Sequence, residues 1–282
     1  MTRWDLPRIR DLMLAAGKMA LHYFDRPTTR LKADNSLVTE ADNAIEEFFR
    51  GELTGDGAML LGEESSEGWT QDEVDRALSG STWIVDPIDG TAPYANQLPT
   101  WGISLGLMQS GVLTNGALFL PRTGELFITD DTAVYYHRGA RNPEYWSFDE
   151  LSPMAVQEHP YAPTGMVSLP REVVFGGHYA GPNPVQANGS AVYSIAKLLR
   201  GAYLCYIARI KLWDVAGAVP ILDRLGFRIV RQDGGHLTTS VDRQNWVLDA
   251  DSAQLSKALK LRLIARHPQT IEVMQRQYRS RR

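Results

Sequence analysis

The chain has 282 residues, of which 44% are hydrophobic, and it carries a formal net charge of −4. This apolar content suffices for a sizeable core, so we expect one globular domain made of two packed halves, residues 1–138 and 139–282. Without an excess of positive charge, nucleic acid and membrane surfaces are poor candidates for partners. Because its single cysteine, Cys205, excludes an intramolecular disulfide, we expect a reducing compartment, the cytoplasm.

An amphipathic helix is predicted near the start of the chain. Asp5 is a plausible N-cap and Pro7 fits the first turn. Apolar residues then recur at helical spacing, namely Ile9, Leu12, Met13, Ala16, Ala20 and Tyr23. Asp11 and Lys18 interrupt this apolar stretch, so residues 1–24 suit neither a signal peptide nor a membrane span.

A second helix and two short strands follow. Residues 42–50 (DNAIEEFFR) form the helical pattern, and Thr39 can cap it. Residues 58–61 and 83–85 are short apolar runs typical of buried strands. Because Pro87 has no N–H and favours extended backbone in the residue before it, we expect the second strand to end there in a turn.

The rest of the chain mixes strands and helices. Residues 101–136 are apolar runs broken by turn residues, which predicts an antiparallel meander, and residues 139–170 contain five of the fifteen prolines, which predicts an irregular connection. The elements expected after it are a strand at 173–175, a helix at 189–199, a strand at 203–207, a helix opening at Trp213, strands within 227–230, 236–239 and 246–248, and helix from Ser252 onward. This mixture indicates a layered α/β or α+β architecture.

Two carboxylates stand out in residues 83–91 (WIVDPIDGT). Asp86 and Asp89 follow a buried apolar run, at the end of a strand where α/β proteins usually build their sites. Such close carboxylates repel each other and raise each other's pKa unless a cation lies between them. Their hard oxygen ligands favour Mg²⁺, and the sequence has no His/Cys cluster that would favour zinc.

Neighbouring residues extend this candidate metal site. Gly90 lets the backbone approach a ligand closely, and Thr91 offers a hydroxyl and an N–H for phosphate. Glu63 in LGEES and Asp214 in WDVAGA are further candidate ligands at a strand end and a helix start. Each of these residues, taken singly, is better explained as a cap, a turn residue or solvated surface, and only their combination favours a metal site.

The motifs GEES, WIVDPIDGT and WDVAGA, in that order, closely resemble those of the inositol monophosphatase family, and residues 32–42 (KADNSLVTEAD) resemble its N-terminal signature. The resemblance spans residues 32 to about 222. It implies a layered α-β-α-β-α sandwich, usually assembled as a homodimer. It also implies hydrolysis of a small phosphorylated metabolite, a phosphate monoester, with two or three Mg²⁺ ions and inhibition by Li⁺.

Carried over position by position, the resemblance assigns roles to individual residues. The first half would carry most of the metal site and the second half, residues 139–282, would complete it. The implied metal ligands are Glu63, Asp86, Asp89, Asp214 and the carbonyl of Ile88. The implied catalytic residues, which place or activate the attacking water, are Asp42, Glu63 and Thr91. The implied substrate contacts are Asp89, Gly90, Thr91, Ser190 and Arg209, although Ser190 is equally well read as a helix N-cap.

The sequence departs from the family pattern where inositol phosphatases often carry a glutamate that contacts sugar hydroxyls. Ile207 and its neighbours occupy that region, which argues against inositol monophosphate as the physiological substrate. Arg209 is either a solvated strand end or a second anion contact. Residues 32–42 also resemble the family branches that act on histidinol phosphate and on 3',5'-bisphosphate nucleotides, so both remain open as substrates. A non-catalytic interaction module is a further alternative, and the complete carboxylate set argues against it as the sole role.

Overall fold

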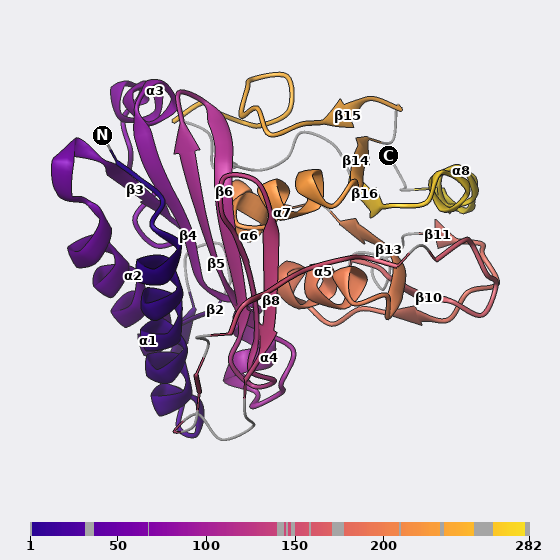
Figure 1. Ribbon diagram of the computed structural model, residues 1–282, viewed down its shortest axis with the longest axis horizontal. Helices are drawn as coiled ribbons and strands as arrows, with labels where there is room; N and C mark the ends of the chain where they lie inside the picture. Colours follow the sequence, from indigo (N-terminus) through magenta and orange to yellow (C-terminus); the bar gives the residue numbers. More distant parts are fainter. Residues whose placement is uncertain are drawn as a thin grey trace.

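The computed structural model describes residues 2–31, 37–66, 68–139, 144, 146–147, 150–157, 159–170, 178–208, 210–231, 234–250 and 262–279. Two large sheets and the helices around them form its layers (Figure 1). Helices α1 and α2 cover the outer face of a seven-stranded sheet, α5, α6 and α7 fill the space between the two sheets, and α8 lies beyond a six-stranded sheet. The expected α-β-α-β-α sandwich is confirmed.

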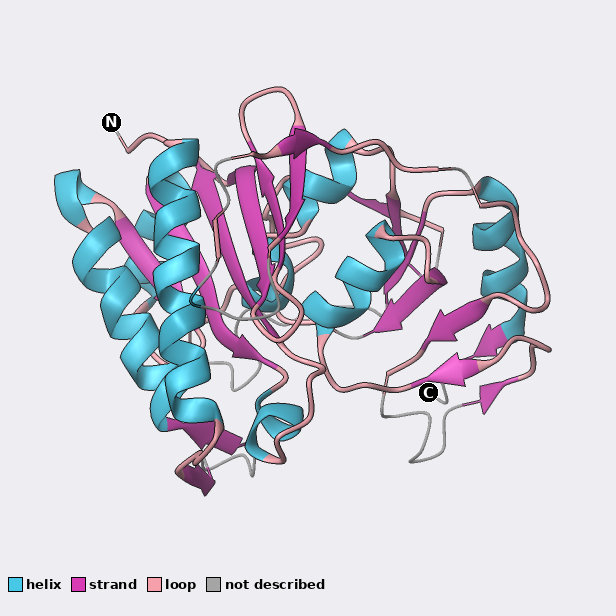
Figure 2. Ribbon diagram, turned by 60° about the horizontal axis from the view of Figure 1, so that its bottom comes forward, coloured by secondary structure: helices cyan, strands magenta, loops and turns pink. Residues whose placement is uncertain are grey.

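The outer layer consists of α1 (Leu6–Phe24) and α2 (Glu40–Leu53), which lie side by side on the first sheet (Figure 2). Asp5 caps α1 by accepting the N–H of Arg8 at 3.1 Å, and a proline lies in the first turn, as predicted. Thr39 caps α2 in a capping box with Asp42. The apolar faces of both helices pack with the sheet in one buried cluster.

The seven-stranded sheet has the order β3-β4-β5-β6-β7-β8-β9. Its strands are β3 (Met59–Gly62), β4 (Ser81–Asp89), β5 (Gly102–Gln109), β6 (Val112–Leu120), β7 (Glu125–Thr129), β8 (Val134–Arg138) and β9 (Ser152–Pro153). Strands β4 to β9 are antiparallel neighbours, which confirms the predicted meander. Strand β3 pairs in parallel with β4 after the crossover helix α3 (Gln71–Ser79).

The prediction that the second strand ends at Pro87 is wrong. Strand β4 continues to Asp89, with a shift in its pairing to β5 between Asp86 and Asp89. Proline is tolerated at such an irregularity because no ladder hydrogen bond from its nitrogen is needed there. Gly90 follows in the left-handed region, at a φ of +95°, and leads into the short helix α4 (Thr91–Ala95).

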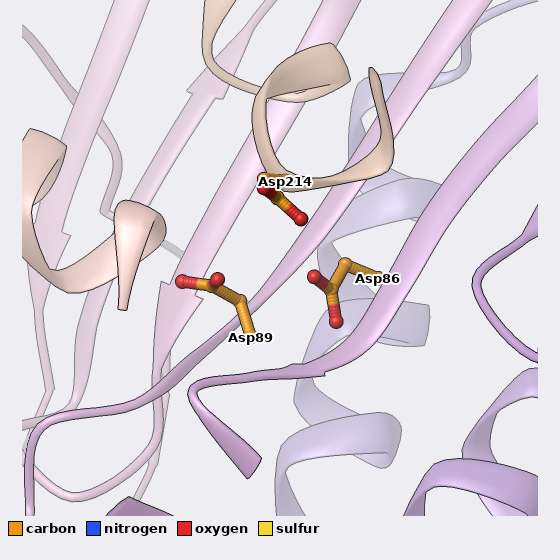
Figure 3. A group of neighbouring side chains, drawn as sticks. All are labelled: Asp86, Asp89 and Asp214. Atoms are coloured by element: carbon orange, nitrogen blue, oxygen red, sulfur yellow. The ribbon is translucent and has the colours of Figure 1, made fainter. Parts of the chain in front are cut away.

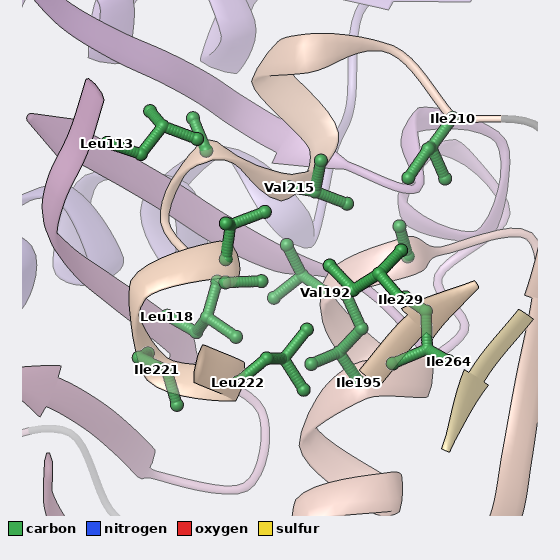
Figure 4. Close-up of a cluster of buried hydrophobic side chains, with 14 of the residues drawn as sticks. Leu113, Leu118, Val192, Ile195, Ile210, Val215, Ile221, Leu222, Ile229 and Ile264 are labelled. Carbon is green, nitrogen blue, oxygen red and sulfur yellow. The ribbon is translucent and has the colours of Figure 1, made fainter. Parts of the chain in front are cut away.

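The middle layer joins the two sheets. It contains α5 (Ala191–Leu199), α6 (Leu212–Ala216) and α7 (Val219–Arg224), which confirms the predicted helices at 189–199 and from Trp213. Figure 4 shows their apolar side chains between Leu118 of the first sheet and Ile229 and Ile264 of the second. These residues belong to one buried cluster, so α5 and α6 are held firmly against the strands that carry the candidate site.

The six-stranded sheet has the order β12-β10-β13-β16-β14-β15. Its strands are β10 (Met166–Ser168), β12 (Val185–Gln186), β13 (Tyr203–Ala208), β14 (Arg228–Arg231), β15 (His236–Leu237) and β16 (Arg262–Ala265), and α8 (Pro268–Gln277) covers it. The remaining elements are β1 (Thr29–Leu31) paired with β2 (Leu37–Thr39), β11 (His178–Tyr179) paired with β17 (Tyr278–Arg279), and the 3₁₀ turn Gly55–Gly57.

Predictions for the second half have mixed outcomes. The strands within 203–207, 227–230 and 236–239 are confirmed. The strand at 246–248 is wrong, because no strand element covers those described residues and Trp246 instead fills a buried loop. The C-terminal helix exists, but β16 precedes it; the predicted strand at 173–175 and residues 251–261 lie outside the described residues. Among the helices that the structure describes, none has the length and apolar character needed to cross a bilayer.

Candidate active site

Three aspartates from two separate segments lie close together at the inner face of the first sheet. One carboxylate oxygen from each of Asp86, Asp89 and Asp214 lies within 4.8 Å of the others. Figure 3 shows the three side chains around one small space, two from β4 and one from α6, with the carboxylates of Asp86 and Asp214 facing each other. Asp214, which lies 125 residues after Asp89 in the sequence, therefore shares one small space with Asp86 and Asp89.

The irregularity in β4 explains how two of these side chains come to share a face. In a regular strand, residues three apart point to opposite faces of the sheet. Here Asp86 pairs with Ser104 and Asp89 with Gly102, so three steps along β4 match only two along β5. The extra residue is a bulge, which returns Asp89 to the side of the sheet on which Asp86 lies.

Helix α6 can bring Asp214 over the same sheet because the strands below it have glycines at the two points of closest approach. A Cβ at Gly106 would lie 2.6 Å from the Ala216 carbonyl, and one at Gly116 would lie 2.0 Å from the Gly217 oxygen. Any larger residue at these positions on β5 and β6 would push the helix away. The close approach of backbone to backbone therefore sets the distance between Asp214 and the aspartates of β4.

Burial and mutual repulsion raise the pKa values of the cluster. For Asp86 the pKa rises well above its ordinary value, because of burial first and then the charges of Glu63, Asp89, Asp214 and Asp42. The pKa of Asp214 is also raised, by burial and by Asp89. Moreover, Oδ1 of Asp86 is buried without any hydrogen-bond partner. A buried, unpaired carboxylate is costly, so the residues present fit a bound divalent cation well.

Asp89 differs from its neighbours because the start of helix α5 stabilises its charge. Its carboxylate accepts hydrogen bonds from the Ser190 hydroxyl and from the Val192 N–H, the latter at 2.6 Å. Burial still outweighs these bonds and raises the pKa of Asp89 to about 6. Ser190 is also the N-cap of α5, accepting the Tyr193 N–H at 3.0 Å, so the helix-cap interpretation of Ser190 is confirmed.

Asp42 lies at the start of α2 with one oxygen bonded and the other free. Oδ2 accepts the N–H of Thr39 at 2.8 Å and its hydroxyl at 2.6 Å. Oδ1 is buried without a partner. Burial raises the pKa of Asp42 to about 7, with Thr39 lowering it and the charges of Glu64 and Glu63 raising it further. Its charge also contributes to the raised pKa of Asp86.

Glu63 stands in the turn after β3, beside the three aspartates rather than within their 4.8 Å group. Its charge contributes to the raised pKa of both Asp86 and Asp214. Glu63 Oε1 lies 3.8 Å from the Nζ of Lys211, and that ammonium also lies 4.9 Å from the centre of the Trp213 ring. Lys211, whose backbone N–H donates to Asp214 at 2.8 Å, thus provides positive charge at the edge of the cluster.

The residues implied to bind phosphate follow directly after the bulge. The hydroxyl of Thr91 donates to the carbonyl of Ile88 at 3.2 Å, which places both groups in one tight turn. Gly90 is required there twice over, by its left-handed φ and because a Cβ would lie 2.9 Å from that of Ser190. Gly90 therefore lets the backbone of this turn lie close to Ser190, at the start of α5.

Arg209 and Ile207 are the residues from which the sequence analysis argued about the substrate. Arg209 lies outside the described residues. Ile207 is 1% exposed and packs with Cys205 and Met274 in the core between the second sheet and α8. An apolar side chain in this core offers no hydrogen bond to a sugar hydroxyl.

The raised pKa values predict how the metal-free protein responds to pH. A carboxyl whose pKa is raised by folding contributes stability below its unfolded pKa, near 3.8, and that stability is lost as the pH rises through the folded pKa. We therefore expect the melting temperature in chelator to fall between pH 5 and pH 8. Thermal unfolding with and without Mg²⁺ measures this, and Mg²⁺ should remove most of the fall. An unchanged or rising melting temperature in chelator would contradict it.

Comparison with known proteins shows which family this chain resembles in sequence. The sequence model of the inositol monophosphatase family matches residues 8–269. A histidinol-phosphatase of Chlorobaculum parvum is 26% identical over 79% of this chain and 83% of its own length. An inositol-1-monophosphatase of Bacillus subtilis is 28% identical over 68% of this chain and 71% of its own length.

Solved structures share the fold. An IMPase of Thermotoga maritima superposes with a TM-score of 0.69 at 17% identity, covering 96% of both chains. An IMPase/NADP phosphatase complexed with Mg²⁺ and phosphate superposes with a TM-score of 0.68 at 17% identity, covering 98% of this chain and 97% of that one. The chain belongs to the inositol monophosphatase family, whose metal-dependent members act on small phosphorylated substrates. It is accordingly a phosphatase, a hydrolase of phosphoric monoesters.

Proposed function

We propose that this phosphatase hydrolyses a small phosphate monoester with two or three Mg²⁺ ions bound at the aspartate cluster. The observation that carries the proposal is the set of three buried carboxylates within 4.8 Å of one another, one of them with an oxygen that has no partner. The residues that would hold the ions are Glu63, Asp86, Asp89, Asp214 and the carbonyl of Ile88. All five donors are hard oxygen ligands, which suits Mg²⁺.

Bound divalent cations would lower the pKa of a water and neutralise charge on the phosphoryl oxygens. The chain's own residues would do the rest. Asp42, whose pKa of about 7 lets it accept a proton near neutral pH, would take the proton of the attacking water through its free Oδ1. Thr91 would orient that water, and the N–H groups of Gly90 and Thr91 would bind phosphate oxygens. The water oxygen would bond to phosphorus as the phosphorus–oxygen bond to the alcohol breaks. The leaving alkoxide would take a proton from solvent, so that the products are inorganic phosphate and the free alcohol.

Among candidate substrates, histidinol phosphate deserves the first test. The buried Ile207 provides no polar contact for inositol hydroxyls, and the relative from Chlorobaculum parvum, which matches most of this chain, is a histidinol-phosphatase. A 3',5'-bisphosphate nucleotide would require a second anion contact, for which Lys211 at the edge of the cluster is the described candidate. The proposal extends to a cytoplasmic homodimer that Li⁺ inhibits, as the family resemblance implies.

Steady-state phosphate release across a substrate panel tests this function. We expect release that requires Mg²⁺, falls with added Li⁺ and has a clearly highest kcat/KM for one of inositol monophosphate, histidinol phosphate, a 3',5'-bisphosphate nucleotide or fructose bisphosphate. Undiminished turnover in excess chelator would refute the metal-dependent mechanism. No hydrolysis across the panel, together with a specific protein partner, would instead favour a non-catalytic role.

A further inference from the structure

Glu46 is a buried carboxylate on α2 that the proposed mechanism does not use. It lies one helical turn after Asp42, and its residue surface is only 3% exposed. Its Oε1 accepts a hydrogen bond from Arg50 at 3.0 Å, and its Oε2 accepts the backbone N–H of Glu64 at 2.9 Å. The second bond joins the helix to the turn that carries Glu63.

The end of β3 is shaped to receive this carboxylate. A Cβ at Gly62 would lie 2.2 Å from Oε2 of Glu46 and 2.3 Å from its carboxyl carbon. Gly62 does not have a left-handed φ, so it is the approach of the Glu46 side chain that excludes a larger residue there. The carboxylate thus occupies the space beside the strand, directly before Glu63.

The charge of Glu46 is hard to explain by packing alone. Its carboxylate is almost completely buried, and a buried charge is costly unless it is paired and hydrogen-bonded. Arg50 offsets that charge, and an ionised acceptor makes a stronger bond to an N–H than a neutral one. A charged acceptor is therefore suited to holding the backbone of the turn firmly in place.

We propose that Glu46 is a positioning residue, which holds the turn after β3 so that Glu63 faces the aspartate cluster. The inference rests on the proposed role of Glu63 as a metal ligand. Helix α2 then fixes two functional groups at once, because Asp42 lies at its start and Glu46 anchors Glu63 one turn later. Partners that orient a metal ligand are worth about 10-fold to 100-fold in metal affinity or activity.

Three variants test the inference. Glu46→Gln keeps the size and one acceptor but removes the charge, and Glu46→Ala removes the contact with Glu64 entirely. Glu47→Gln is the matched control, because Glu47 is the next residue on α2 and pairs with the same Arg50 at 3.5 Å, yet its side chain is 78% exposed. The measurements are Mg²⁺ binding by calorimetry, the Mg²⁺ dependence of kcat, and thermal unfolding in chelator.

We expect Glu46→Gln to weaken Mg²⁺ binding about tenfold and Glu46→Ala to weaken it more, while Glu47→Gln binds as the unmodified protein does. Saturating Mg²⁺ should restore most of the kcat of Glu46→Gln, which a loss of folded protein would not allow. Unchanged Mg²⁺ affinity in a folded Glu46→Gln, or an equal loss in Glu47→Gln, would overturn the inference. If the unmodified protein bound no Mg²⁺, the metal site itself would be wrong and the inference would fall with it.

Discussion

Replacing Asp86 with asparagine is expected to lower kcat/KM for phosphate release about 10³-fold and, at the same time, to stabilise the metal-free protein. The carboxylate of Asp86 is buried among other negative charges, and one of its oxygens has no partner. A neutral amide of the same size removes this repulsion and can donate to the neighbouring carboxylates. It would also remove one of the proposed metal ligands. Losing about 4 kcal/mol of transition-state stabilisation with that ligand corresponds to about a 10³-fold drop in kcat/KM.

The measurement pairs kinetics with thermal unfolding in chelator at pH 7.5, where the melting temperature of Asp86→Asn should exceed that of the unmodified protein by several degrees. Asp130→Asn is the control, for which we expect the opposite change in melting temperature. Asp130 accepts the N–H groups of Thr132 and Ala133, each at 2.7 Å, and although burial alone would raise its pKa, these bonds lower it to about 2. Its stabilising effect is present above the unfolded pKa, so its loss should lower the melting temperature and spare activity. A less stable Asp86→Asn, or one with substantial turnover, would contradict the proposal.

Elements with strong local signals could be predicted from the sequence. Helices α1 and α2 have apolar residues at helical spacing and side-chain caps at Asp5 and Thr39, and both are present with those caps. The antiparallel meander was likewise marked by its turn residues. Short strands of the second sheet carry little such information, because β10 and β12 have only three and two residues and depend on their neighbours in the sheet.

The candidate site, too, could be predicted only in part from the sequence. The motifs indicated which residues to consider, but Pro87 argued locally for a turn, and only the pairing of β4 with β5 shows a bulge within a continuous strand. The contact between Glu46 and Gly62 was missed because it depends on the packing of α2 against the end of β3. The sequence could have indicated that Glu46 has a buried partner. Glu46 lies next to Ile45 on the buried face of an amphipathic helix, where a carboxylate requires a partner.

Replacing Asp42 with asparagine is expected to lower kcat about 10²-fold to 10⁴-fold while leaving Mg²⁺ binding nearly unchanged. The amide oxygen of asparagine can still accept both hydrogen bonds from Thr39, so the cap of α2 is kept. What would be lost is the proposed acceptor of a proton from the attacking water, and general-base catalysis is worth about that factor. Single-turnover kinetics at saturating Mg²⁺, together with calorimetric Mg²⁺ binding, separate this effect from loss of a metal ligand.

Thr39 offers an independent test of the same role, because its hydroxyl donates to Asp42 at 2.6 Å and so favours the ionised carboxylate. Thr39→Val removes this donor and should raise the pKa of Asp42 above about 7, whereas Thr39→Ser retains it. If Asp42 must be ionised to accept the proton, the acidic limb of the kcat/KM profile moves to higher pH in the valine variant alone, and activity recovers at alkaline pH. A uniform loss at every pH would point to a damaged helix cap instead, and an unchanged profile would show that Asp42 does not govern the proton transfer.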